Sequence, residues 1–136
     1  MLNFILLAIA ITGIIALLLV GYISNLKFRQ KLARVDQKKV DQNLIQIKDL
    51  EVSNPVLAVI EADKLLDYVL KGASSKGGFT DRLKSREYRL TNVQATWDSH
   101  KLRNRLVHDL DSEDQYSNQQ LTHASKNLRK AIGELR

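Results

Sequence analysis

The sequence of 136 residues contains no cysteine, so it offers neither a disulfide framework nor a cysteine-based zinc site, as suits a reducing compartment. It also lacks the alternating pattern of a β-strand and any internal repeat. The glycines of residues 73–80, ASSKGGFT, are not followed by Lys-Ser or Lys-Thr and no strand precedes them, which excludes a phosphate-binding loop. No Gly-x-Ser-x-Gly elbow supports Ser/His/Asp catalysis.

Charged residues are missing from Leu2–Ile23, LNFILLAIAITGIIALLLVGYI. A helix of this length extends about 33 Å, which is enough to span a bilayer. A cleaved signal peptide would place basic residues ahead of a shorter apolar core, whereas here they follow a long one. The sequence therefore predicts an uncleaved transmembrane anchor over residues 1–24, with lipid contact through residues 2–23.

The formal net charge of +6 is concentrated just after this anchor. Lys27 to Lys39 holds six basic residues against one acidic residue, whereas residues 40–136 hold 15 basic and 14 acidic residues. Such a cluster keeps the following chain in the cytoplasm and contacts anionic headgroups. The membrane-proximal basic residues are Lys27, Arg29, Lys31 and Arg34. We expect a single-pass protein of the cell membrane, with the N-terminus outside and the C-terminal domain in the cytoplasm.

Apolar residues at helical spacing predict a bundle of about four helices over residues 54–136, joined to the anchor by a basic juxtamembrane stalk over residues 25–53. The stalk is expected to be helical or partly disordered, and the apolar residues near its end, among Leu44, Ile47 and Leu50, are expected to pack onto the domain. One predicted helix starts at Asn54 and Pro55 and buries Val59, Ala62, Leu65, Leu66, Val69 and Leu70. Its expected solvated side carries Asp63, Lys64, Asp67 and Lys71. The last predicted helix buries Leu121, Ala124, Leu128, Ala131, Ile132 and Leu135. Further helix starts are expected at Thr80, at Thr91 or Asn92, and at a Ser117–Gln120 capping box.

The stretch WDSHKLRNRLVHD, residues 97–109, belongs to a predicted helix with two faces to bury. At about 100° per residue, one stripe is apolar and consists of Ala95, Leu102, Leu106 and Leu110. A second, mixed face carries Val93, Trp97, His100, Asn104, Val107 and His108. Either this helix is enclosed within its own bundle, or the second face is reserved for another subunit or a ligand.

Arg103 and His108 border the second face and combine two useful chemistries. A guanidinium group binds phosphate by a bidentate fork, and an imidazole group transfers protons near neutral pH. For RNA this pair suffices without a metal, because the 2′-hydroxyl is an intramolecular nucleophile. His100 and His108 lie about 12 Å apart along a helix, too far to share one ion. We expect no metal and no cofactor.

The run Arg103-Asn104-Arg105-Leu106-Val107-His108 resembles the motif of HEPN domains, small helical bundles that include bacterial RNase toxins and RNA-cleaving defence proteins. Its surroundings also look like those of membrane-anchored bacterial HEPN-like proteins. The resemblance implies a homodimer in which two Trp97–His108 helices form a shared cleft. It implies that Arg103 positions the phosphate, His108 is the acid or base, and Asn104 orients the site. Contacts to substrate or to the interface are expected from His100, Trp97 and Lys101.

Two functions follow from this sequence. The first is a membrane-tethered, metal-independent endoribonuclease, active as a homodimer and of the toxin or defence type. The second is a non-catalytic, membrane-anchored protein-interaction module, in which Arg103 pairs with an acid and His108 caps a helix end. The motif favours the first function, whereas the nearly neutral charge of residues 40–136 favours the second. The sequence identifies no antitoxin or other protein partner.

The orientation can be tested with a reporter fused after Arg136. Because the basic residues follow the anchor, we expect a reporter that works only in the cytoplasm to be active, and one that works only outside the cytoplasm to be silent. The opposite pattern would contradict both the orientation and a cytoplasmic ribonuclease.

Overall fold

The computed structural model describes residues 2–32, 35–73, 76–108 and 115–136, and all regular structure within them is helical. The elements are α1 (Leu2–Leu32), α2 (Gln37–Ser53), α3 (Pro55–Ala73), α4 (Phe79–Lys84), the 3₁₀ turn η1 (Glu87–Arg89), α5 (Val93–His108) and α6 (Asn118–Leu135). The predicted all-α class, with an apolar N-terminal helix ahead of a small bundle, is confirmed.

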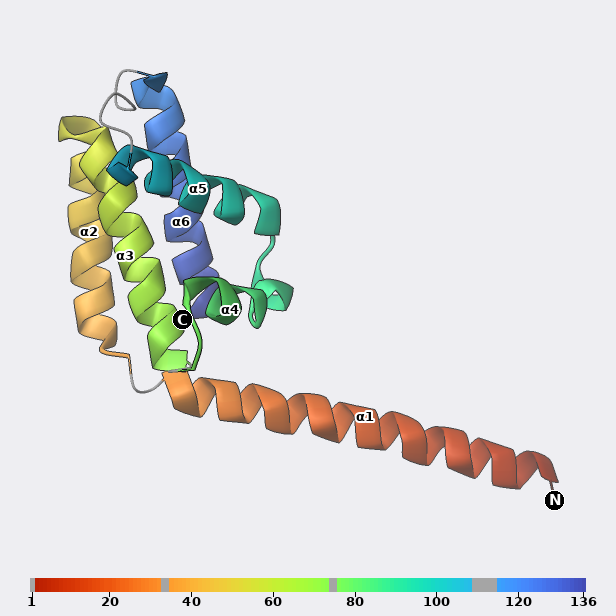
Figure 1. Ribbon diagram of the computed structural model, residues 1–136. Helices are drawn as coiled ribbons and strands as arrows, with labels where there is room; N and C mark the ends of the chain where they lie inside the picture. The colour runs from red at the N-terminus through yellow and green to blue at the C-terminus, as the bar shows by residue number, and fades with distance from the viewer. Residues whose placement is uncertain (1, 33–34, 74–75, 109–114) are drawn as a thin grey trace.

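The domain is built around α3. In Figure 1, α2, α3 and α6 stand side by side, and α5 crosses α3 and α6 at a steep angle. The short helix α4 packs beside α3, and α1 leaves the foot of the bundle and extends away from it (Figure 1). The predicted apolar stripes of α3 and α6 are both confirmed, because every residue named for them is buried.

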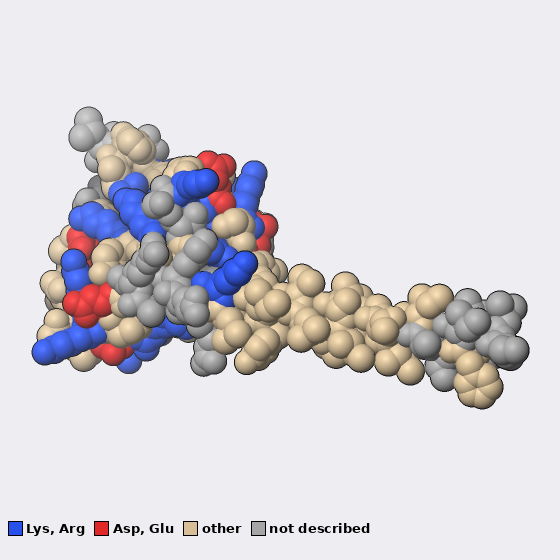
Figure 2. All heavy atoms as spheres, turned by 90° about the horizontal axis from the view of Figure 1, so that it is seen from below, with Lys and Arg blue, Asp and Glu red and all other residues tan. Residues whose placement is uncertain are grey.

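The helix α1 contains one segment, Ile9–Lys27, that is long and apolar enough to cross a membrane. None of this segment is buried against the domain. On the face shown in Figure 2, the described part of the protruding helix carries no charged side chain along most of its length, whereas Lys, Arg, Asp and Glu are spread over the domain. Lys27 lies at the end of the segment, but Arg34 and the side chains of Arg29 and Lys31 lie outside the described part of the structure.

The segment expected to be a stalk contains the helix α2, and Leu44, Ile47 and Leu50 near its end pack onto the bundle as expected. Val40 and Ile47 of α2 are buried, and α2 packs against α3 and α6. Near its end, Glu51 accepts two hydrogen bonds from Arg129 of α6, at 2.8 and 3.0 Å. Apolar residues at helical spacing and this buried ion pair hold α2 in place, so the domain begins near residue 35 rather than at residue 54.

The domain's first residue packs at the far end of α3. Val35 is buried, and a Cβ atom added at Gly72 would overlap its Cγ2 atom. A glycine at this position in the last turn of α3 therefore lets the chain that returns from α1 approach closely.

Three of the expected helix starts are confirmed. Asn54 caps α3 by accepting a hydrogen bond from the Leu57 N–H, and Asn92 accepts one from Ala95 at the start of α5, both at 3.0 Å. Ser117 and Gln120 form the capping box of α6.

The expected start at Thr80 was wrong. The helix α4 begins at Phe79, and the preceding Gly78 N–H donates to Asp81 Oδ2 at 3.1 Å. Gly77, with φ of 78°, turns the chain into this position. The start of α4 is therefore capped by the Asp81 carboxylate, which accepts from the Gly78 N–H, and not by the Thr80 hydroxyl.

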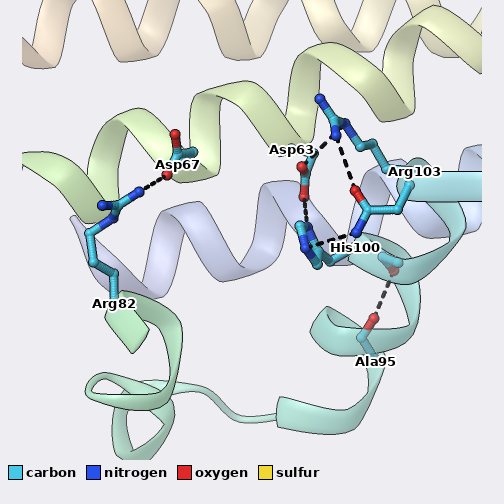
Figure 3. Close-up of polar contacts among 8 residues, drawn as sticks. Asp63, Asp67, Arg82, Ala95, His100 and Arg103 are labelled. Carbon is cyan, nitrogen blue, oxygen red and sulfur yellow. Dashed lines mark hydrogen bonds and ion pairs between the residues drawn. The ribbon is translucent and has the colours of Figure 1, made fainter. Parts of the chain in front are cut away.

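The helix α4 is fixed to α3 by a buried arginine. The side chain of Arg82 is 8% exposed, and its Nη2 donates to Asp67 Oδ1 at 2.6 Å (Figure 3). Lys71 contacts the other carboxylate oxygen at 2.7 Å. Burial by itself would raise the pKa of Asp67, but the hydrogen bonds with Lys71 and Arg82 outweigh it and lower the pKa below its usual value. Asp67, expected to be solvated, thus joins two helices.

We predict that Asp67→Asn lowers the free energy of unfolding by about 1.5–3 kcal/mol at neutral pH, the range for hydrogen bonds to charged groups. Because the folded-state pKa is lowered, this stabilisation is fully present above the unfolded-state value of about 4 and is lost as the pH falls through the folded value. Urea unfolding of residues 35–136 at several pH values should show the wild type and the variant converging in acid. A pH-independent difference would contradict this role.

Candidate functional site

The candidate site is organised by a buried carboxylate on α3. Asp63, which the sequence analysis placed on the solvated side, is 4% exposed and lies under α5. Its Oδ1 atom lies 2.8 Å from His100 Nδ1, and its Oδ2 atom lies 3.5 Å from Arg103 Nε (Figure 3). The second distance is that of an ion pair without a formed hydrogen bond. Burying a carboxylate is energetically costly unless it is paired in this way. Asp63 is therefore part of the site and not of the solvent-exposed surface.

Asn104 closes these contacts into a ring. Arg103 Nη1 donates to Asn104 Oδ1 at 3.0 Å, and Asn104 Nδ2 lies 3.2 Å from His100 Nε2. The side chain that the HEPN resemblance assigned to orientation therefore contacts both His100 and Arg103.

The positions of the protons in this ring of four side chains follow from the chemistry of Arg103. A guanidinium group only donates, so the Asn104 atom facing it is the carbonyl oxygen, and the amide nitrogen faces His100. The amide nitrogen donates, so His100 Nε2 accepts. The imidazole group of His100 therefore carries its proton on Nδ1, which donates to Asp63. Both nitrogens of His100 are thus engaged within the chain.

Aromatic rings cover His100 from the other side. Phe79 of α4 stacks on it with centroids 3.9 Å apart and an interplanar angle of 13°, and Trp97 meets both rings edge-on. Trp97 Nε1 donates to Glu87 Oε1 of η1 at 2.7 Å. Trp97 and His100 are therefore packed inside their own domain, as the enclosed-helix interpretation expected.

The second face of α5 consequently has two halves. The N-terminal half, with Trp97 and His100, is covered by α3, α4 and η1. The C-terminal half is open, because Val107 is 48% exposed and His108 is exposed. Arg103 lies between the halves with its side chain 25% exposed, and its Nη2 atom has no hydrogen-bond partner among the described residues.

The other predicted positions are less informative. Lys101 is exposed. Leu110 lies among residues 109–114, which are outside the described part of the structure. Within residues 2–32, 35–73, 76–108 and 115–136, no group of three or more His, Cys, Asp or Glu residues is placed to hold a metal ion.

A second polar cluster, between α5 and α6, was missed by the sequence analysis. Ser99 is buried and donates to the Ala95 carbonyl at 2.7 Å, so its oxygen accepts from Asn127 Nδ2 at 3.4 Å. The same amide lies 3.3 Å from His123 Nδ1. Since the amide donates, His123 carries its proton on Nε2, the tautomer opposite to that of His100.

Comparison with known proteins leaves the site to be judged on its geometry. A scan of family models and searches of curated proteins and of solved structures found no match to this chain.

We predict that the two histidines adopt opposite tautomers, as their hydrogen-bond partners require. Long-range ¹H–¹⁵N correlation spectra of residues 35–136 should place the proton of His100 on Nδ1 and that of His123 on Nε2. Asn104→Ala removes the donor to His100 Nε2 and should alter the His100 signals alone. The same tautomer in both residues would contradict the hydrogen-bond assignment.

Proposed function

We propose that the chain is a membrane-tethered, HEPN-like, metal-independent endoribonuclease of the toxin or defence type, acting as a homodimer. The observation that carries the proposal is the state of Arg103. Its Nε and Nη1 atoms face Asp63 and Asn104, whereas Nη2 keeps donors for a ligand, on the helix face that ends in the exposed His108. A guanidinium group held in this way loses little conformational freedom when it binds a phosphate.

In the proposed reaction, the 2′-oxygen of RNA attacks the adjacent phosphorus and the bond to the 5′-oxygen breaks. A base takes the proton of the 2′-hydroxyl and an acid gives one to the leaving 5′-oxygen, so the products carry a 2′,3′-cyclic phosphate and a 5′-hydroxyl. Arg103 offsets the charge on the phosphoryl oxygens. His108 is the proton-transfer group, since both nitrogens of His100 are engaged within the domain.

A second copy of the chain completes this chemistry. One His108 cannot act as base and acid in the same step, whereas two copies supply two imidazole groups. The open C-terminal half of the α5 face, with Val107 and His108, is the surface proposed to pair. Trp97 supports this surface from within and is not part of the contact.

The proposed location is the cell membrane, with α1 as a single span and the domain in the cytoplasm. The Ile9–Lys27 segment supports the span by its length and composition, and the basic residues from Lys27 onward support the orientation. In this arrangement the domain meets RNA in the cytoplasm while it stays at the membrane surface.

One observation favours the non-catalytic interaction module as a second candidate. In that function Arg103 pairs with an acid for structural reasons, and its ion pair with Asp63 fits that description. The two candidates differ in what the open half of the α5 face contacts, since a module would present Val107 and His108 to another protein and leave RNA intact.

The proposal is tested with residues 35–136, which retain the buried Val35 and the Asp36 cap of α2. This fragment should cleave mixed cellular RNA in the presence of a metal chelator and leave 2′,3′-cyclic phosphate ends. His108→Ala should lower the rate by about 100-fold or more, the usual contribution of general acid–base catalysis. Arg103→Lys should also lower it by about 100-fold or more, the usual effect of removing a donor that stabilises charge in the transition state. Arg103→Lys keeps the positive charge next to Asp63 and removes the planar fork.

The control is His123→Ala, because His123 is also exposed but lies on α6, outside the proposed site. Circular dichroism should show all variants folded. A folded, dimeric wild-type fragment that leaves RNA intact would refute the ribonuclease and favour the interaction module. Equal loss of activity in His123→Ala would move the site away from α5.

A further inference from the structure

A separate polar site lies where α1 meets the domain. Tyr88 and Arg89 of η1, with Gly21, Ser24 and Asn25 of α1, line an open hollow of about 430 Å³. Arg89 Nη2 donates to Asn25 Oδ1 at 2.9 Å, which holds the guanidinium group against α1. Two segments far apart in the sequence therefore build this hollow together.

The hollow lies at the depth of lipid headgroups when residues 2–23 of α1 span a bilayer. The apolar run ends at Ile23, Ser24 and Asn25 follow it directly, and Lys27 is the first charged residue of the chain. Gly21 to Lys27 covers about 9 Å of helix at 1.5 Å per residue. This rise is comparable with the headgroup layer on one side of a bilayer, about 5–8 Å.

The chemistry of the hollow favours an anion. The hydrogen bond from Arg89 is the main cause that lowers the pKa of Tyr88, and it outweighs burial, which raises the pKa; Arg86 lowers it further. These guanidinium groups favour the charged form of the phenol. Arg89, which lines the hollow, can donate to a phosphate in a bidentate manner.

We propose that this hollow binds the phosphate of an anionic lipid headgroup. Arg89 donates to the phosphate oxygens, Tyr88 and Ser24 supply hydroxyl groups beside it, and Asn25 orients the guanidinium group. The apolar surface of α1 continues from the hollow, with Val20 66% exposed and Ile23 48% exposed, and provides a track for the acyl chains. This track favours a lipid over a soluble phosphate. The site rests on the proposed insertion of α1 and is independent of ribonuclease activity.

The test uses the full chain in nanodiscs of phosphatidylcholine, with or without phosphatidylserine, and native mass spectrometry of the lipids retained after release. The wild type should retain phosphatidylserine in preference to phosphatidylcholine. Arg89→Gln should lower this retention by about tenfold, the effect of one lost hydrogen bond to a charged group.

A second variant blocks the hollow without changing charge. A Cβ atom added at Gly21 meets nothing within 4 Å, so Gly21→Leu fills the hollow without a clash. It should lower phosphatidylserine retention as Arg89→Gln does. Gly13→Leu is the matched control, because Gly13 is also in α1 with open space around it but does not line the hollow.

The remaining outcomes separate the causes of failure. A chain that inserts into phosphatidylcholine nanodiscs but shows no preference for phosphatidylserine would overturn this site and leave the anchor intact. A chain that does not insert would overturn the anchor and the site together.

A further arm of the experiment adds inorganic phosphate to phosphatidylcholine nanodiscs. If the wild type binds this phosphate and Arg89→Gln does not, the hollow is a site for a soluble phosphate, and the lipid assignment is overturned.

Discussion

The arrangement of the domain depends on burying one carboxylate, Asp63, in the middle of α3. Leaving such a group unpaired in the interior would cost more than the domain's other contacts could easily offset. Its partners, His100 and Arg103, come from consecutive turns of α5. The crossing of α5 over α3 is therefore fixed in register as well as in position, because a shift of α5 by one residue would remove both partners.

The same logic recurs one turn along α3. Asp67 lies four residues after Asp63, so both side chains lie on one side of the helix, and Asp67 holds Arg82 of α4 (Figure 3). With α4 and α5 each tied to α3 by an ion pair, Phe79 of α4 is brought onto His100 of α5. The aromatic cover over His100 thus follows from two acids spaced one helical turn apart. The open half of α5 begins where this cover ends.

Much of the fold could be predicted because it depends on local rules. The stripes of α3 and α6 follow from apolar spacing, and the starts at Asn54, Asn92 and Ser117 follow from cap chemistry. The apolar spacing near the end of α2 was recognised, but the charge of residues 27–39 hid the start of its packed part, because only contacts with α3 and α6 show that Val40 is buried.

The centre of the candidate site was only partly predictable. At 100° per residue, Asp63 lies about 20° from Leu70 and about 40° from Val59, so the helical wheel already placed it within the apolar stripe. Its charge led to the solvated assignment, although a charged residue inside an apolar stripe indicates a buried partner. The identity of that partner depends on how α5 crosses α3, which no local pattern encodes. Arg103, Asn104 and His100 could therefore be singled out from the sequence, but not joined to Asp63.

The turn η1 connects α1 to the motif helix α5. Within its three residues, Arg89 donates to Asn25 of α1 and Glu87 accepts from Trp97 of α5. Trp97 in turn packs against His100, in the ring that holds Arg103. A continuous series of contacts therefore leads from the polar residues that follow the apolar run of α1 to the guanidinium group of the proposed site. Because each step is a hydrogen bond or a packed ring, the orientation of α5 relative to α1 is set by η1, and with it the direction in which Arg103 and His108 face when α1 is in a membrane.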